Sequence, residues 1–137
     1  IVPARAQVLI TKPIKHLKIH GSFHYEKGYY YFRNVGDRIL FGGGRNLDFE
    51  GETTTDFGTT AIIQQRLDEL LNKMILPGQE AVIEMRWSGI MGLGPSKSTI
   101  IQKVDTNIFC AVRMGGMGVA IGTTVGESGA DLILQSL

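Results

Sequence analysis

Residues 28–43 read GYYYFRNVGDRILFGG, and this stretch decides the expected fold class. Aromatic and β-branched residues are enriched in strands, and a Val-Gly-Asp turn between two such runs is typical of a hairpin. Upstream, residues 17–27 (LKIHGSFHYEK) partly alternate between apolar and polar side chains, which predicts a further strand bent at Gly21. Together these segments predict an antiparallel meander that ends at Gly43.

Downstream of the meander, the sequence predicts one amphipathic helix over residues 59–75. Thr59 or Thr60 can cap its start, and Pro77 with Gly78 ends it. Its apolar residues recur at spacings of three and four, as one buried face of a helix requires: Ile63, Leu67, Leu70, Leu71 and Met74.

Three further strands are predicted, over residues 7–11, 80–93 and 107–114. The last of them (NIFCAVRM) is apolar almost throughout, so we expect it to be a buried central strand. Between the meander and the helix, residues 44–58 are polar and irregular. We interpret their acidic side chains as solubilising, with a flexible lid as the alternative; they are Asp48, Glu50, Glu52 and Asp56.

The C-terminal tail begins with RMGGMGVAIG, residues 113–122, and is predicted to be a helix because it is long and does not alternate. Small residues recur there at helical spacing: Gly118, Gly122, Gly126, and Gly129 or Ala130. Each glycine costs about 1 kcal/mol of helix stability relative to alanine. A face without side chains therefore suits the close approach of a flat ligand or of another backbone. The expected class is α+β: a mostly antiparallel sheet, one amphipathic helix packed on it, and a glycine-rich C-terminal helix.

The composition describes one domain that can bury a core, with 137 residues, 43% of them hydrophobic, and a net charge of +1. A net charge this close to zero gives no indication of binding to nucleic acid or to an anionic membrane. Polar residues interrupt the tail, whereas a membrane span needs about 20 apolar residues. One cysteine, Cys110, excludes a disulfide framework and favours a reducing, cytoplasmic setting.

Three histidines, His16, His20 and His24, are spaced four apart and would share one face of a strand. No set of carboxylates or cysteines accompanies them. Metal binding stays open on this spacing, but such histidines are more often surface residues, and we predict no metal site.

The start of the predicted C-terminal helix has the chemistry of a binding site for an anion or an electron-rich carbonyl. The first turn of a helix carries free N–H groups and a positive dipole end, and glycines let a ligand reach them. The spacing Gly115-Gly116-x-Gly118 does not match the Gly-x-Gly-x-x-Gly of a dinucleotide loop. A tight strand-to-helix turn without a ligand is equally compatible with these residues.

Three segments, in this order, resemble the C-terminal part of FAD-dependent oxidoreductases of the D-amino-acid oxidase, glycine oxidase and sarcosine oxidase type. Residues 2–11 (VPARAQVLIT) resemble the family strand that reads Pro-x-Arg-Gly-Gln-Val. Residues 28–48 resemble its aromatic-rich paired strands followed by Gly-Gly. Residues 86–134 resemble its Trp-x-Gly turn, variable segment, strand and glycine-rich helix start. The resemblance implies a fragment of a two-domain flavoprotein.

The resemblance also implies a domain organisation and partners. Residues 1–112 would be a substrate-domain sheet that includes the helix over residues 59–75, and residues 113–137 a C-terminal helix that contacts the flavin. The N-terminal Rossmann half of the family, with its Gly-x-Gly-x-x-Gly loop, has no counterpart in this chain. We therefore expect weak FAD binding or none without that half of the same polypeptide, which would be a partner together with a small-molecule substrate.

The resemblance assigns site residues as well. Cofactor contacts would come from the helix start, whose N–H groups would stabilise negative charge near flavin N1 and the C2 carbonyl; the residues are Met114, Gly115, Gly116, Met117, Gly118 and Val119. Tyr30 matches the substrate-facing tyrosine of the family. Arg113 stands where the family usually has glycine; it would bring a positive charge beside the flavin, or serve only as a surface or structural cation.

Two departures from the family pattern bear on the substrate. Met91 and Gly116 occupy positions where amino-acid-specific and glycine-oxidase-like members carry an arginine for the substrate carboxylate. The implied reaction is hydride transfer to flavin from an amine, amino-acid or hydroxy-acid type substrate, and whether amino acids are accepted stays open. The alternative is a non-catalytic module that associates, also with itself, through unpaired sheet edges.

Overall fold

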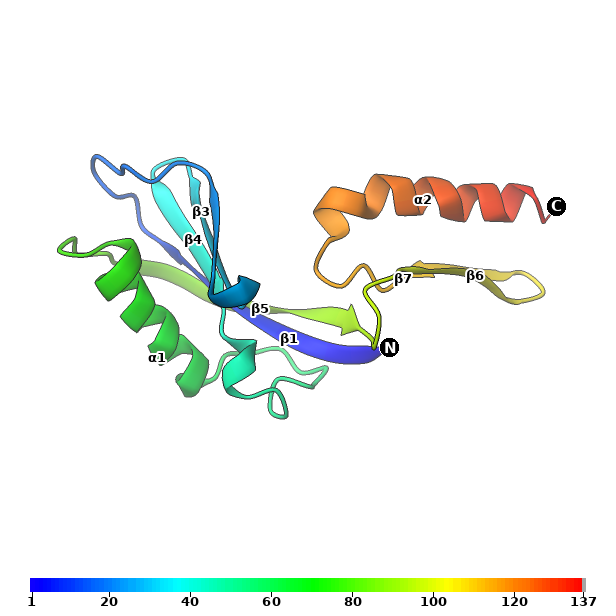
Figure 1. The fold of residues 1–137 in the computed structure, drawn as a ribbon, viewed down its shortest axis with the longest axis horizontal. Helices are drawn as coiled ribbons and strands as arrows, with labels where there is room; N and C mark the ends of the chain where they lie inside the picture. Colours follow the sequence, from blue (N-terminus) through cyan, green and yellow to red (C-terminus); the bar gives the residue numbers. More distant parts are fainter. Residues whose placement is uncertain (137) are drawn as a thin grey trace. The chain divides into compact units, whose positions relative to one another are not determined.

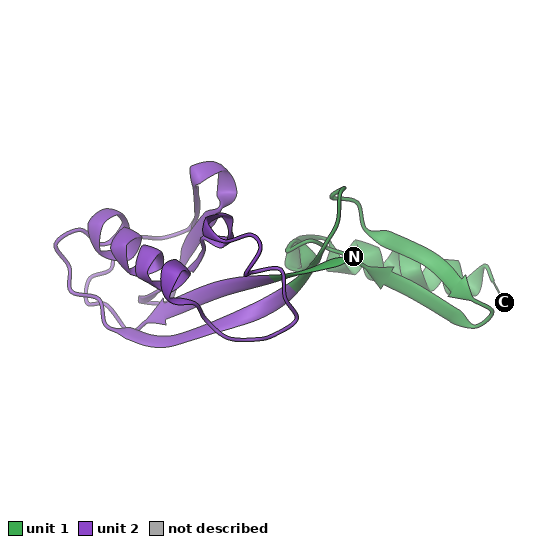
Figure 2. Ribbon diagram, turned by 90° about the horizontal axis from the view of Figure 1, so that it is seen from below, with its two compact units in different colours: residues 1–4, 91–137 green, residues 5–90 purple. Residues whose placement is uncertain are grey.

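The computed structural model describes residues 1–136 and contains two compact units (Figure 2). Unit 2 consists of residues 5–90, and unit 1 consists of residues 1–4 together with the chain from Met91 onward. The sequence predicts a different division, after residue 112, between the substrate-domain sheet and the helix that would contact the flavin. That division is based on expected function and not on compactness. It stays a prediction.

An antiparallel meander dominates unit 2, and the expected α+β class with a mostly antiparallel sheet is confirmed (Figure 1). The strand order in the sheet is β2-β3-β4-β1-β5, and β4 pairs antiparallel with both β3 and β1. Phe41 of β4 is the register partner of Phe32 on one side and of Leu9 on the other. The strands are β1 (Val2–Thr11), β2 (Ser22–Tyr25), β3 (Tyr30–Val35), β4 (Arg38–Gly43) and β5 (Ile83–Leu93).

Glycines in left-handed conformations shape the meander. Gly36 turns the chain between β3 and β4 with a φ of +59°. The side chain of Asn34 supports this turn, since its Nδ2 donates to the Gly36 carbonyl at 3.2 Å and its Oδ1 accepts from the Gly21 N–H at 2.9 Å. The strand predicted over residues 17–27 is shorter in the structure, because Gly21, with a φ of +122°, precedes the start of β2.

The predicted amphipathic helix is present as α1 (Ala61–Leu70), which continues into one wider π-helical turn (Leu71–Ile75). Its buried side chains pack against the sheet residues of the same core, among them Leu9, Tyr30, Ile39 and Phe41. The wider turn shifts the face of the helix near its end. Met74, predicted to be buried, is 36% exposed, whereas Ile75 is 7% exposed.

A buried polar network fastens the loop before α1 to strand β1. Arg5 donates from Nε to Glu52 Oε2 at 2.9 Å and from Nη2 to Glu52 Oε1 at 2.8 Å. Gln7 Nε2 donates to Glu52 Oε1 at 2.8 Å and to Thr60 Oγ1 at 2.9 Å. Gln7 Oε1 accepts from the Thr60 N–H at 2.9 Å and from Gln64 Nε2 at 3.0 Å. Thr60 thus occupies the N-cap position of α1, but its side chain bonds to this network and not to the helix.

The interpretation of Glu52 as a solubilising loop residue is wrong, because its side chain is 0% exposed. Burial of this carboxyl tends to raise its pKa, but hydrogen bonds from Arg5 and Gln7 and the charge of Arg5 outweigh burial, and the net pKa is lowered. A buried carboxylate has to be paired in this way to be tolerated. Glu50 and Asp56 of the same loop are exposed, in keeping with their interpretation.

Unit 1 contains the hairpin β6 (Ile100–Asp105) and β7 (Ile108–Val112), followed by α2 (Gly118–Leu134). The sequence does not predict β6. The expectation that β7 is a buried central strand is wrong for this chain: β7 pairs with β6 in a two-stranded sheet, and Ile108 is 58% exposed. A Cβ on Gly129 of α2 would lie 3.2 Å from the Ala111 Cβ, so a glycine here allows the helix and β7 to approach closely.

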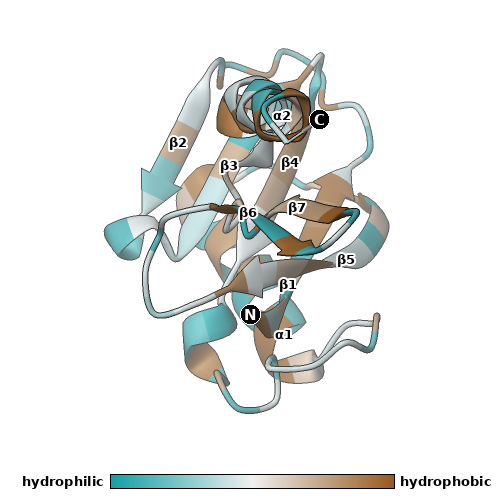
Figure 3. Ribbon diagram, turned by 90° about the vertical axis from the view of Figure 1, so that its right-hand side faces the viewer, coloured by the Kyte–Doolittle hydropathy of each residue, from teal (hydrophilic) through white to brown (hydrophobic). Residues whose placement is uncertain are grey.

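The predicted C-terminal helix is confirmed as α2, and it carries polar as well as apolar residues, which appear teal and brown in Figure 3. No helix within residues 1–136 combines the length and the hydropathy that a bilayer span requires.

Candidate functional site

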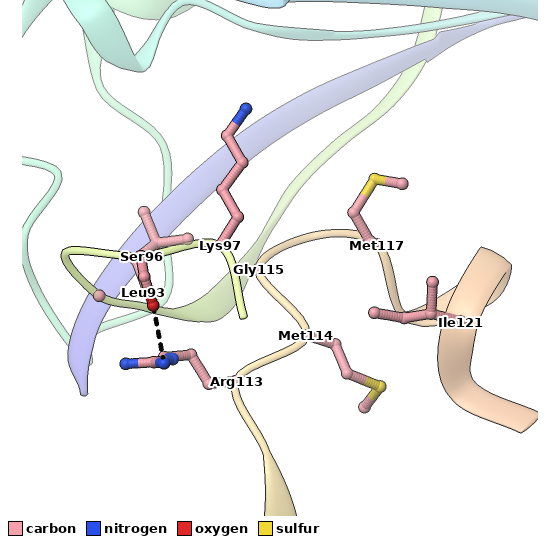
Figure 4. A pocket seen from close by; sticks show the side chains of 9 residues that line it. Leu93, Ser96, Lys97, Arg113, Met114, Gly115, Met117 and Ile121 are labelled. Carbon is pink, nitrogen blue, oxygen red and sulfur yellow. Dashed lines mark hydrogen bonds between the residues drawn. The ribbon is translucent and has the colours of Figure 1, made fainter. Parts of the chain in front are cut away.

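A cavity of about 610 Å³ lies in unit 1, beside the turn that leads into α2 (Figure 4). Its size is within the range of about 300–1,000 Å³ that is usual for small-molecule sites. None of the described residues that line it is acidic; they are Leu93, Gly94, Ser96, Lys97, Arg113, Met114, Gly115, Met117 and Ile121. The cavity therefore combines apolar walls with two cationic side chains and suits a largely apolar guest that carries electron-rich or anionic atoms.

The turn before α2 is left-handed at three of its residues. Arg113, Gly115 and Gly116 have φ values of +64°, +57° and +84°. Such values are accessible to glycine without steric cost, whereas arginine rarely adopts them. The Met117 N–H donates to the Met114 carbonyl at 2.9 Å and closes the turn. The two glycines thus bring the backbone around sharply and leave it uncovered.

Helix α2 begins without a side-chain cap. Met117 occupies the N-cap position and makes no capping hydrogen bond. Among residues 1–136, the structure gives the N–H groups of Gly118 and Val119 no acceptor, and Val119 is fully exposed. Two polarised donors at the positive end of a helix are therefore free to bind an electron-rich atom.

The Arg113 side chain is held on the cavity wall by the segment that follows β5. Its Nη2 donates to Ser96 Oγ at 3.1 Å (Figure 4). Its Nε donates to the Ser98 carbonyl at 2.9 Å. A Cβ on Gly94 would lie 2.6 Å from Arg113 Nη1, so the guanidinium lies directly against that backbone. These contacts fix a positive charge in place, which is a structural role and also a means of positioning charge at the cavity.

The structure gathers the predicted flavin-contacting residues in one turn, although they differ in their access to the cavity. Arg113 and three of the six predicted cofactor contacts line it, whereas Gly116, Gly118 and Val119 belong to the same turn without lining it. A Cβ on Gly116 would lie 3.1 Å from Met91 Sδ. The two positions that lack the arginine of the family thus contact each other and form an apolar spot.

Sequence reasoning missed the lining residues that precede the β6–β7 hairpin: Leu93, Gly94, Ser96 and Lys97. The Gly-Pro-Ser run over residues 94–96 is a turn signal that could have indicated a bend there. Nothing in the local pattern indicates that the bend lies against residues 113–117, because that contact joins distant parts of the chain.

Tyr30, predicted to face the substrate, lies in the core of unit 2 with 1% exposure. Its ring packs against Phe41 and Tyr25, with centroid separations of 6.3 Å and 6.1 Å. Hydrogen bonding with Tyr30 raises the pKa of Arg66 in α1, with Glu69 adding to the effect. The placement gives Tyr30 a packing role, and its catalytic role stays an untested prediction.

Tyr31 follows Tyr30 in β3 and therefore points to the opposite face of the sheet. It is half-buried, and burial raises the pKa of its hydroxyl. A Cβ on its register partner Gly42 would lie 2.8 Å from that hydroxyl, so the phenol occupies space that only glycine leaves free. Among the described residues, the Tyr31 hydroxyl has no hydrogen-bond partner.

The three histidines do not form a cluster. Only His24 lies in β2, while His16 has a left-handed backbone in the preceding loop. Over residues 1–136, no group of three or more histidine, cysteine or acidic side chains is arranged to hold a metal ion.

Comparison with known proteins places this geometry in a wider context. A family model described as FAD dependent oxidoreductase (DAO) matches residues 1–132. Among solved structures, the chain is similar to the crystal structure of L-proline dehydrogenase from P. horikoshii, with 25% sequence identity and a TM-score of 0.80. The similarity covers 98% of this chain and 36% of that one, so the chain spans little more than a third of its solved relative. A comparison with curated proteins finds no match.

Proposed function

Because the chain belongs to the FAD dependent oxidoreductase family, we propose that residues 113–119 contact the flavin ring of FAD in the complete protein. The observation that carries this proposal is the left-handed, glycine-rich turn at the uncapped start of α2, which opens beside the cavity of unit 1. The family match indicates FAD as the cofactor and does not favour a non-catalytic association module.

The residues present fit one edge of the flavin but not the whole of FAD. The free N–H groups of Gly118 and Val119 suit the electron-rich oxygen and nitrogen atoms of the pyrimidine ring, and the apolar walls suit the rest of a flat ring system. No Gly-x-Gly-x-x-Gly loop occurs in the chain, so it offers no pyrophosphate site. The ADP part of FAD would be bound by the FAD-binding region that the family implies.

The proposed reaction is oxidation at a carbon that carries nitrogen or oxygen. Bound FAD would supply the acceptor for the hydride and would gain negative charge in the process. The chain's own contribution is electrostatic: the N–H groups of Gly118 and Val119 stabilise that charge, as donors do in an oxyanion hole. Arg113, fixed by Ser96 and Ser98, adds a cation that needs no reorganisation during the reaction.

For the substrate we propose an amine, an amino acid or a hydroxy acid. The solved relative is named for L-proline, which is an amino acid and a secondary amine. The apolar contact between Met91 and Gly116 offers no partner to a carboxylate. Paired substrates with and without a carboxylate, compared by kcat/KM on the complete protein, distinguish these classes.

A pair of glycine substitutions in the complete protein tests the flavin contact. A Cβ on Gly118 would meet only Met114, with its nearest atom at 3.7 Å, so Gly118→Ala leaves the fold intact and favours the helix. The new methyl group would nevertheless stand between the helix start and the ring. We expect weaker FAD retention or flavin reduction slowed about tenfold, which corresponds to about 1.4 kcal/mol.

Gly126→Ala is the matched control, because it makes the same change in α2 at a position where a Cβ would meet nothing within 4 Å. It should keep normal FAD retention and normal reduction. Equal behaviour of the two variants, both with unchanged flavin binding and reduction, would contradict the proposed contact.

A further inference from the structure

We propose that residues 45–57, called the strap from here on, form a hinged segment that opens from and closes on strand β1, with the Arg5–Glu52 ion pair as its latch. Glu52 alone among the strap residues is buried, and its side chain is 0% exposed. The other strap residues are exposed or half-buried, including Leu47, Phe49 and Phe57. The one buried side chain of this long segment is thus an inward-pointing carboxylate, and the Phe49 ring adds an edge-to-face contact with Tyr29 at a centroid separation of 6.2 Å.

Glycines at both ends provide the hinges. Gly44 precedes the strap with a φ of +83°, and Gly58 follows it with a φ of +133°. Both values lie in the left-handed region, where glycine rotates at lower cost than other residues. A Cβ on Gly58 would meet nothing within 4 Å, and one exposed hydrogen bond, from the Gly58 N–H to Ser88 Oγ of β5 at 2.9 Å, holds this hinge. Hinges of moving loops are commonly a few end residues of this kind.

The latch is a single side chain of β1 that reaches three points of the strap. Besides its two bonds to the Glu52 carboxylate, Arg5 donates from Nη1 to the Asp56 carbonyl at 3.3 Å and from Nη2 to the Gly51 carbonyl at 3.4 Å. The Arg5 backbone N–H also donates to the Glu52 carbonyl at 2.8 Å. The Arg5 side chain alone thus makes four hydrogen bonds to the strap, and loss of the ion pair would weaken its attachment to β1 at several points together.

Internal bonds allow the strap to move as one body. The Gly51 N–H donates to Asp48 Oδ1 at 2.9 Å, and Thr53 Oγ1 donates to the Phe49 carbonyl at 2.7 Å. Opening would carry the exposed apolar side chains of the strap with it. It would also withdraw Glu52 from Gln7 and so loosen the start of α1, where the Thr60 N–H donates to Gln7.

Amide hydrogen exchange on the whole chain tests the latch, with Glu52→Gln compared against Glu50→Gln. Both variants remove one negative charge from the strap, but Glu50 is exposed. In Glu52→Gln we expect the amides of Arg5, Gly58 and Thr60 to exchange at least about tenfold faster, as in local opening. The Ile39 amide, which donates to buried Thr11 Oγ1 in the sheet, should keep its protection. Glu50→Gln should match the wild type.

Arg5→Lys is the second variant, for the case that Glu52→Gln does not fold. Lysine retains the positive charge of arginine but cannot make the bidentate contact with the Glu52 carboxylate. It should speed exchange at Gly58 and Thr60 while leaving Ile39 protected. Equal acceleration at Ile39 in either folded variant would show global unfolding and overturn the proposal. Unchanged exchange at Gly58 and Thr60, or an equal effect of Glu50→Gln, would overturn it as well.

Discussion

Tyr30 and Tyr31 are neighbours in sequence, yet β3 sends them to opposite faces of the sheet because side chains alternate along a strand. Tyr30 is packed in the core against Phe41, whereas the Tyr31 hydroxyl lies over Gly42 without a partner in the described chain. A substrate can reach a hydroxyl on an open face, and a core tyrosine acts mainly through its ring.

Removing each hydroxyl in the complete protein separates these roles. The prediction from the sequence is that Tyr30→Phe lowers kcat/KM more than it lowers stability. The placement of the two side chains leads to the opposite expectation. Tyr31→Phe should lower kcat/KM about tenfold, which corresponds to about 1.4 kcal/mol. Tyr30→Phe should affect only stability. Steady-state kinetics and thermal unfolding of both variants decide which tyrosine contacts the substrate; normal turnover in both excludes each of them.

At the scale of single elements, the π-helical turn after α1 changes which side chains support the core. Ile75 is 7% exposed and belongs to the core cluster, whereas Met74 is 36% exposed. A regular helix would have buried Met74, as its spacing predicts. The wider turn ends with the Leu76 N–H donating to the Leu71 carbonyl at 2.8 Å.

Alanine substitutions at these two positions test the turn. Ile75→Ala should lower the free energy of unfolding by about 2–4 kcal/mol, since it leaves a cavity in a packed core. Met74→Ala should cost less than about 1 kcal/mol, as is usual for a largely solvated side chain. Chemical denaturation of the two variants gives both values, and a larger loss for Met74→Ala would show that the helix is regular.

On the scale of the whole molecule, the chain has the turn that we propose contacts one edge of a flavin, and it contains no Gly-x-Gly-x-x-Gly loop for the pyrophosphate. We therefore expect the chain of residues 1–137 to be colourless and to lose FAD during gel filtration. The complete protein should retain it. Absorbance of the protein peak at the flavin band measures the difference, and stoichiometric FAD on the isolated chain would contradict this expectation.

Sequence patterns alone determined the fold class, the meander, α1 and the helical tail of this protein. They also marked the start of the helical tail as suited to an anion or an electron-rich carbonyl, whereas the flavin contact of residues 113–119 was implied only by the resemblance to the family. These features are local: alternation, helical spacing and glycine-rich turns depend on residues a few positions apart. The same local rules allowed a tight strand-to-helix turn before α2, and the structure adds that its backbone is left-handed at Arg113, Gly115 and Gly116.

Only the tertiary structure decided which side chains those elements bury and which distant segments they join. Local pattern treated Glu52 as a loop carboxylate, but Arg5 and Gln7 of β1 enclose it because the chain folds back across the sheet. The sheet register likewise placed Tyr30 rather than Tyr31 in the core. The cavity depends on the segment after β5 lying against the turn before α2. Contacts of this kind depend on the free energy of the whole packed chain. They cannot be predicted from the spacing of residues a few positions apart.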